Sequence, residues 1–136
     1  MGMTAKEFLC NVSWSRKDLT CTEDLSLREI DEIFALADIF KAEVKKDRTK
    51  LPYLKGKTVV NLFFEPSTRT RTAFEMAAHK LGADVISFSS SISSSVKGET
   101  LKDTARNIEA LMADMIIVRH SSSGAAKYLA DRVDIP

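Results

Sequence analysis

The chain has 136 residues, of which 44% are hydrophobic and 29% charged, and its formal net charge is +1. This length and composition predict one compact domain with a single core and exclude an intrinsically disordered chain. The near balance of 20 basic and 19 acidic residues argues against a nucleic-acid binder, and no apolar run is long enough to cross a bilayer.

The cysteine count and the N-terminus indicate the compartment. Cys10 and Cys21 are the only cysteines and form no C-x-x-C motif, which excludes a disulfide scaffold and fits a reducing environment. The N-terminus shows no secretory signal pattern. We therefore expect a cytoplasmic domain that has neither a membrane nor a nucleic acid as partner.

The pattern becomes regular at Ser26, which forms an S-x-x-E capping box with Glu29. The apolar residues behind it are spaced as on one face of a helix: Ile30, Ile33, Ala37, Phe40 and Val44. The basic residues of 45–50 then gather where the negative end of the helix dipole falls, and they predict a solvated helix end.

The rest of the chain alternates between strand and helix patterns. Three short apolar segments predict buried strands, at 58–64, 84–88 and 115–118. Helical spacing follows each of them, at 67–81, 100–112 and 125–133. In the second of these helices the inward residues are expected to be Leu101, Ala105, Ile108 and Leu111.

This alternation predicts an α/β fold: a three-layer, doubly wound parallel sheet with helices on both faces. Ligands of such sheets bind beyond the carboxyl ends of the strands. That rule selects three polar segments, residues 65–71, 89–99 and 119–124.

The segment after the first strand reads E-P-S-T-R-T-R-T at 65–72. Ser67 is expected at the helix N-cap, so Arg69 and Arg71 fall at the positive end of the helix dipole, where cations are disfavoured. A bound phosphate resolves this conflict, with Arg69 on the ligand and Arg71 paired with Glu75. The alternative is a capped helix whose arginines point to solvent or pair with Glu75. No Walker A loop is present, which disfavours nucleotide hydrolysis.

The other two segments each allow two interpretations. Lys97 ends a serine-rich stretch that is either a flexible linker or a mobile loop bringing a charge to a phosphate. Arg119 follows the third strand, and it either reaches the same cleft as Arg69 or forms a structural ion pair. His79, expected at the surface, and His120 lack the spacing of zinc ligands, and no covalent nucleophile is visible.

Three motifs occur together, in the order F-F-E-P-S-T-R-T-R-T-A-F-E at 63–75, V-K-G-E-T-L-K-D-T at 96–104 and V-R-H at 118–120. With these motifs the sequence resembles the transcarbamoylase family, and more closely the carbamoyl-phosphate domain of the aspartate carbamoyltransferases. The K-G-E-T motif favours the aspartate enzymes over the ornithine enzymes.

The resemblance implies a set of site residues. Ser67, Thr68, Arg69 and Thr70 would hold the phosphate of carbamoyl phosphate, and Thr70 and Arg119 would reach the carbamoyl oxygen. Ser93 and Lys97 match a loop that enters the neighbouring subunit's active site, and Glu65 and Glu99 match positions that organise the sites. The family works as a homotrimer with shared active sites and uses neither a metal nor an organic cofactor.

The resemblance also implies which domain of the family this chain corresponds to. Residues 1–136 correspond to the carbamoyl-phosphate-binding domain; the H-P-T-Q segment and the aspartate-binding domain of the family are absent. We expect a part of an enzyme that carbamoylates L-aspartate in pyrimidine biosynthesis, and expect this chain alone to bind carbamoyl phosphate or phosphate weakly without turnover. The alternatives are another transcarbamoylase, such as an ornithine enzyme, or a non-catalytic module for trimer assembly or regulation. Regulatory or pathway-enzyme subunits stay open as further partners.

Overall fold

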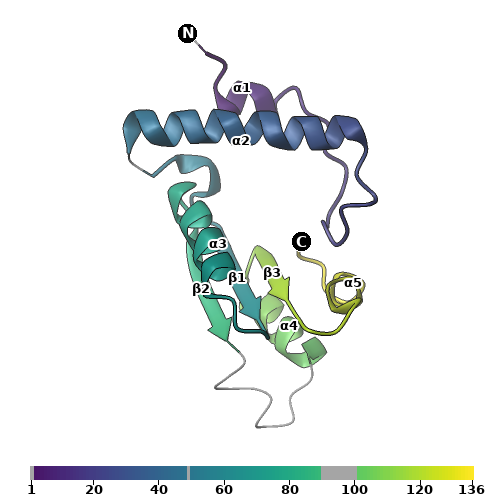
Figure 1. Cartoon of the computed structure of the whole chain (residues 1–136). Coiled ribbons are helices and arrows are strands. Elements are labelled where there is room, and N and C mark those ends of the chain that lie inside the picture. The colour runs from purple at the N-terminus through teal and green to yellow at the C-terminus, as the bar shows by residue number, and fades with distance from the viewer. Residues whose placement is uncertain (1, 49, 90–100) are drawn as a thin grey trace.

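The computed structural model describes residues 2–48, 50–89 and 101–136 (Figure 1). Within these ranges three strands form one sheet, in the order β2-β1-β3. They are β1 (Thr58–Phe63), β2 (Asp84–Ser89) and β3 (Met115–Arg119). Both neighbouring pairs are parallel, so the predicted strands and their parallel arrangement are confirmed.

The helices alternate with these strands as the sequence predicts. They are α1 (Ala5–Leu9), α2 (Leu27–Asp47), the 3-10 turn η1 (Pro52–Leu54), α3 (Thr68–Lys80), α4 (Leu101–Ala110) and α5 (Ala125–Ala130). Neither α2 nor any other helix in the described ranges has the length and apolarity that a membrane span requires.

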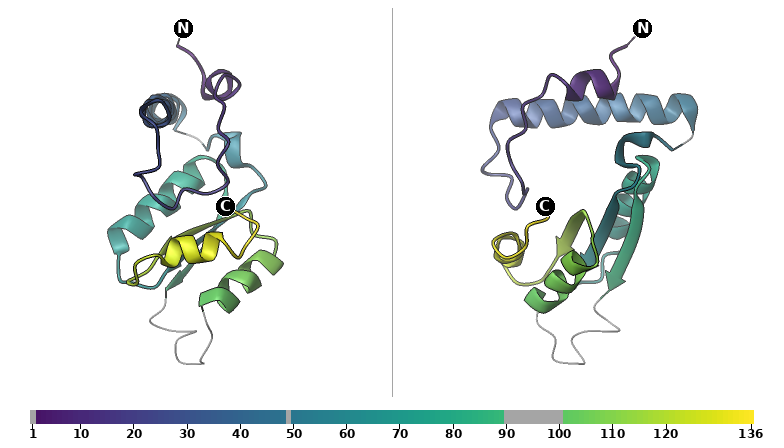
Figure 2. Two further views of the ribbon diagram at one scale, coloured as in Figure 1. Left: turned by 90° about the vertical axis from the view of Figure 1, so that its right-hand side faces the viewer. Right: turned by 180° about the vertical axis from the view of Figure 1, so that it is seen from behind.

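Helices cover both faces of the sheet, which confirms the three-layer prediction (Figures 1 and 2). Successive side chains of a strand point to opposite faces. Val59 of β1 accordingly packs with Ala78 of α3, whereas Val60 packs with Ile108 of α4. Helix α5 joins the α4 side.

Burial along the strands corrects two expectations. The central strand β1 is buried from Val59 to Phe63, but β2 and β3 are the outer strands of the described sheet. Ile86 of β2 is 48% exposed and Met115 of β3 is 39% exposed, so neither is the buried strand that the sequence predicts. Leu111 is not part of the core either, because α4 ends at Ala110 and leaves Leu111 78% exposed.

The start of α2 is as predicted, but its inward face is not. Ser26 and Glu29 form the capping box, and the basic last turn is exposed. Of the predicted stripe, however, Ile33 and Ala37 are exposed, while Leu36 is half-buried. The reason is that α2 does not cover the sheet: it lies beside α1 and η1 (Figure 1), where Phe40 contacts Tyr53.

The N-terminal segment contains α1, a helix that the irregular pattern of residues 1–25 does not predict. Thr4 and Glu7 form a second capping box, and Ala5 is fully buried. Glu43 of α2 holds this corner together, because it accepts the Ala5 N–H (2.9 Å) and the Tyr53 hydroxyl (2.8 Å).

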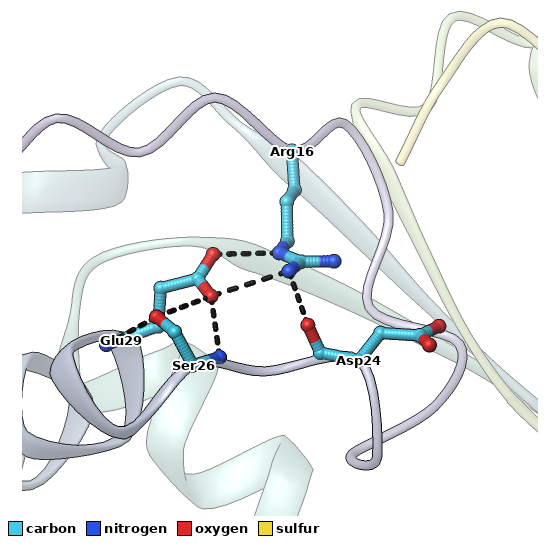
Figure 3. Close-up of polar contacts among 4 residues, drawn as sticks. All are labelled: Arg16, Asp24, Ser26 and Glu29. Carbon is cyan, nitrogen blue, oxygen red and sulfur yellow. Dashed lines mark hydrogen bonds and ion pairs between the residues drawn. The ribbon is translucent and has the colours of Figure 1, made fainter.

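Residues 16 and 17 tie the N-terminal segment to the start of α2 and to the end of α5. The Arg16 guanidinium contacts Glu29 at the start of α2, with Nε 2.6 Å from Oε1 (Figure 3). The Lys17 ammonium donates to the carbonyls of Ala130 (3.1 Å) and Val133 (2.7 Å). Carbonyls at a helix C-terminus lack intrahelical donors, so Lys17 satisfies the end of α5.

Candidate anion-binding site at the carboxyl ends of the strands

The first turn of α3 follows β1 after a four-residue connection, 64–67. Ser67 occupies the N-cap position as predicted, but its side chain makes no capping hydrogen bond. The first intrahelical bond runs from the Arg71 N–H to the Ser67 carbonyl (3.0 Å), so the N–H groups of residues 68–70 precede the hydrogen-bonded part of the helix. The first turn contains no acidic residue, and its positive dipole end is uncompensated by the helix itself.

The two arginines of this turn point to different surroundings. Arg71 Nε lies 3.5 Å from Glu75 Oε1, which confirms the predicted pair. The Arg69 side chain is exposed and makes no hydrogen bond or ion pair with any residue in the described ranges. Among the described residues this matches the alternative in which Arg71 pairs with Glu75 and Arg69 faces solvent.

The carboxyl ends of β1 and β3 lie side by side and are hydrogen-bonded to each other. Phe63 and Arg119 are register partners, and the Phe64 N–H donates to the Arg119 carbonyl (2.8 Å). Beyond this bond, Arg119 Nε lies 3.2 Å from Glu65 Oε2. Arg119 therefore forms an ion pair, which is one of the two interpretations of the sequence. Its side chain is still 45% exposed to solvent.

A cleft of about 360 Å³ opens at this edge of the sheet. It is lined by Glu65 and Arg119, by His120 and by the start of α5, where Gly124 and Ala125 contribute. The chain leaves β1 toward β2 and reaches β3 on the other side, so the cleft lies at a topological switch point, the usual ligand position of such sheets. Gly124 falls in the predicted segment 119–124, whereas Ala125 lies just beyond it, and its small apolar side chain gives no chemical signal in the sequence.

The two histidines differ in setting. His120 contacts the Phe64 ring at 5.0 Å between centroids, and its Nδ1 accepts the Ser122 N–H (2.9 Å). His79 is exposed on α3, as predicted. Across the described part of the chain, no three His, Cys, Asp or Glu side chains gather as a metal site would require.

The described site residues fall into two groups. Glu65 and Arg119 are in contact, and Ser67, Thr68, Arg69 and Thr70 follow Glu65 on the first turn of α3. Of these residues, Glu65 and Arg119 line the cleft, and residues 67–70 do not. The remaining predicted residues, Ser93, Lys97 and Glu99, lie outside the described residues.

This arrangement has the chemistry of a phosphate site. Free N–H groups and the positive end of a helix dipole bind phosphate well, and a guanidinium adds charge-assisted hydrogen bonds. Three hydroxyls, those of Ser67, Thr68 and Thr70, add further donors in the same turn.

Comparison with known proteins gives consistent matches over most of the chain. Residues 17–136 match the family model "Aspartate/ornithine carbamoyltransferase, carbamoyl-P binding domain". The aspartate carbamoyltransferase catalytic subunit of Opitutus terrae is 56% identical over 123 residues, which are 90% of this chain and 39% of that protein. The corresponding subunit of Campylobacter fetus is 59% identical over 122 residues, 87% of this chain and 38% of that protein.

Solved structures give the same result. The catalytic subunit of M. jannaschii aspartate transcarbamoylase superposes with a TM-score of 0.81 at 41% identity, covering 89% of this chain and 39% of that one. Trypanosoma cruzi aspartate transcarbamoylase in complex with carbamoyl phosphate gives a TM-score of 0.81 at 32% identity, covering 88% and 37%. The chain therefore spans about two fifths of the length of these relatives.

Proposed function

Because the chain belongs to the aspartate/ornithine carbamoyltransferase family, we propose that it is the carbamoyl-phosphate-binding part of an aspartate carbamoyltransferase. The observation that carries this proposal is the first turn of α3, where an uncapped helix N-terminus meets an arginine without a protein partner among the described residues. Such a turn suits a small dianion. The relatives from Opitutus terrae and Campylobacter fetus are both named aspartate carbamoyltransferase catalytic subunits, which supports aspartate rather than ornithine as the acceptor in this proposal.

The proposed roles follow the two groups of site residues. Ser67, Thr68 and Arg69 bind the phosphate, and Thr70 lies between the phosphate and the carbamoyl oxygen. Arg119, held by Glu65, donates to the carbamoyl oxygen. Lys97, Ser93 and Glu99 belong to the proposal on their sequence motif alone.

These residues fit the chemistry of carbamoyl transfer. The neutral amino group of aspartate attacks the carbamoyl carbon, a C–N bond forms, and the bond from carbon to the phosphate oxygen breaks. The proton that the attacking nitrogen loses balances the departing phosphate. Negative charge develops first on the carbamoyl oxygen and then on the departing phosphate. Donors fixed around both positions stabilise that charge, and holding the two substrates together lowers the entropic cost. A protein nucleophile is not required.

The domain assignment and the assembly belong to the same proposal. The 136 residues act as one carbamoyl-phosphate-binding domain, and the parts of the relatives that this chain does not span supply the aspartate site. We expect no turnover from the 136 residues alone. A homotrimer with shared sites, regulatory subunits and a cytoplasmic location stay predictions.

Calorimetric titration of the chain with carbamoyl phosphate, and separately with inorganic phosphate, tests the proposal. We expect saturable binding that weakens by about tenfold or more in Arg69→Ala, the loss of a charge-assisted hydrogen bond. Arg28→Ala is the matched control, since Arg28 is an exposed arginine in the first turn of α2, and it should bind as the unaltered chain does. Equal affinity in Arg69→Ala would contradict the proposal, and absence of binding in every form would favour an assembly module.

A further inference from the structure

A polar side chain lies in the middle of the apolar sheet. Asn61 lies on the central strand β1 and is fully buried. Among the described residues it is the only buried one that is polar or charged. Burying an amide is unfavourable unless it is hydrogen-bonded. Its Nδ2 donates to the Ser87 hydroxyl at 3.4 Å, across a register pair of β1 and β2.

The polar contacts continue from the sheet to the start of α3. The Ser87 hydroxyl donates to Glu75 Oε1 (2.5 Å), and the same oxygen is 3.5 Å from Arg71 Nε. Four side chains therefore form one connected path: Asn61, Ser87, Glu75 and Arg71. We call this set the polar path.

The polar path supplies the negative charge that the first turn of α3 lacks. Ser67 does not cap the turn, and the turn has no acidic residue of its own. Arg71 adds a positive charge near the positive end of the helix dipole, which is destabilising unless it is compensated. Glu75 compensates that charge from one turn further along the helix and is itself anchored to β2 through Ser87.

The path also separates the two arginines. With Arg71 turned to Glu75 and half-buried, Arg69 is the exposed guanidinium of the turn. Two residues apart, the side chains already lie on different faces of the helix. Glu75 therefore fixes which guanidinium is free to meet an anion.

We infer that Glu75 is a positioning residue for the anion site: through Arg71 and Ser87 it holds the first turn of α3 against β1 and β2. This inference rests on the proposed function for the identity of the anion. A simple electrostatic effect makes the opposite prediction. Removing the negative charge of Glu75 makes the surroundings more positive, which by itself would tighten anion binding.

Titration of Glu75→Gln with inorganic phosphate separates these effects. Gln keeps the size of the side chain but loses its charge. We expect the dissociation constant to rise by about tenfold, typical of coupled contacts in one network. Ser87→Ala leaves the charges of Glu75 and Arg71 in place and removes the link from Glu75 to β2, together with the hydrogen bond from Asn61. We expect a smaller loss of about threefold.

A second measurement does not depend on the ligand. The Arg71 amide donates to the Ser67 carbonyl in the first turn, and its hydrogen exchange should be faster in Glu75→Gln than in the unaltered chain. Glu32→Gln is the matched control, because it removes another (i, i+4) pair, Arg28–Glu32, from α2. That variant should change neither measurement.

The outcomes are distinguishable. Tighter or unchanged phosphate binding in a folded Glu75→Gln, or unchanged exchange of the Arg71 amide, would overturn the inference. If the unaltered chain binds no phosphate, the proposed function fails, and the exchange measurement still decides whether Glu75 positions the turn.

Discussion

Glu29 is the carboxylate with the densest set of hydrogen bonds around the start of α2. It accepts from Arg16, and its Oε2 also accepts the Ser26 N–H (2.8 Å) and the Ser26 hydroxyl (2.9 Å). These bonds favour the ionised form. Arg16 first, and then Ser26, lower the pKa of Glu29 from 4.5 to about 2.

This lowered pKa predicts a pH-dependent stability. Because the folded-state pKa lies below the unfolded one, the contribution of Glu29 is complete above about pH 4.5 and is lost as the pH falls toward about 2. Urea unfolding of the unaltered chain and of Glu29→Gln at a series of pH values should show their difference in stability shrinking across that range. A difference that stays constant down to low pH would contradict the assignment.

At the scale of elements, helix starts show what local sequence encodes. The box at Ser26 is recognisable because a long apolar period follows it, whereas the equivalent box at Thr4 precedes only five helical residues and no period that would reveal a helix. Gly82 follows the last turn of α3; its φ of +91° is left-handed, and a Cβ there would meet the Leu51 carbonyl oxygen at 2.6 Å. Caps and stops are local, so sequence predicts them well.

The two serines at helix starts should respond differently to substitution. Ser26→Ala removes a formed cap and should lower the free energy of unfolding by about 1 kcal/mol. Ser67→Ala removes a hydroxyl that makes no capping bond, so its stability should change little while its phosphate affinity falls. Denaturant unfolding and phosphate titration of both variants test whether Ser26→Ala loses stability and Ser67→Ala loses phosphate affinity.

The reverse pattern, with stability lost in Ser67→Ala and phosphate affinity lost in Ser26→Ala, would show that Ser67 is a structural cap. It would remove Ser67 from the proposed site.

At the scale of the whole molecule, the sequence predicts the sheet better than the packing around it. The α/β alternation and the parallel pairing follow from hydrophobic periods that are visible in the chain. The buried face of α2 cannot be predicted in this way, because Ile33 and Leu36 are both apolar. Only the position of α1 and η1 decides which of the two is covered. The same holds for β3, whose composition suits a buried strand although it lies at the edge of the sheet.

In the candidate site, too, the sequence predicts some contacts and not others. Strand-end rules place Arg69 and Arg119 at one edge of the sheet, and helical spacing predicts the Arg71–Glu75 pair. The contact of Glu65 with Arg119 depends on the neighbourhood of β1 and β3, and the link from Glu75 to Ser87 depends on how α3 lies on β2. Both are tertiary contacts between segments distant in the chain, which periodicity does not encode.

A crystal structure of the 136-residue chain with carbamoyl phosphate would show whether the first turn of α3 binds the phosphate group. We expect a phosphate group at the first turn of α3, with its oxygens about 3 Å from the N–H groups of residues 68–70 and from the Arg69 guanidinium. Density for the ligand elsewhere, with Arg69 paired to a neighbouring carboxylate, would contradict it.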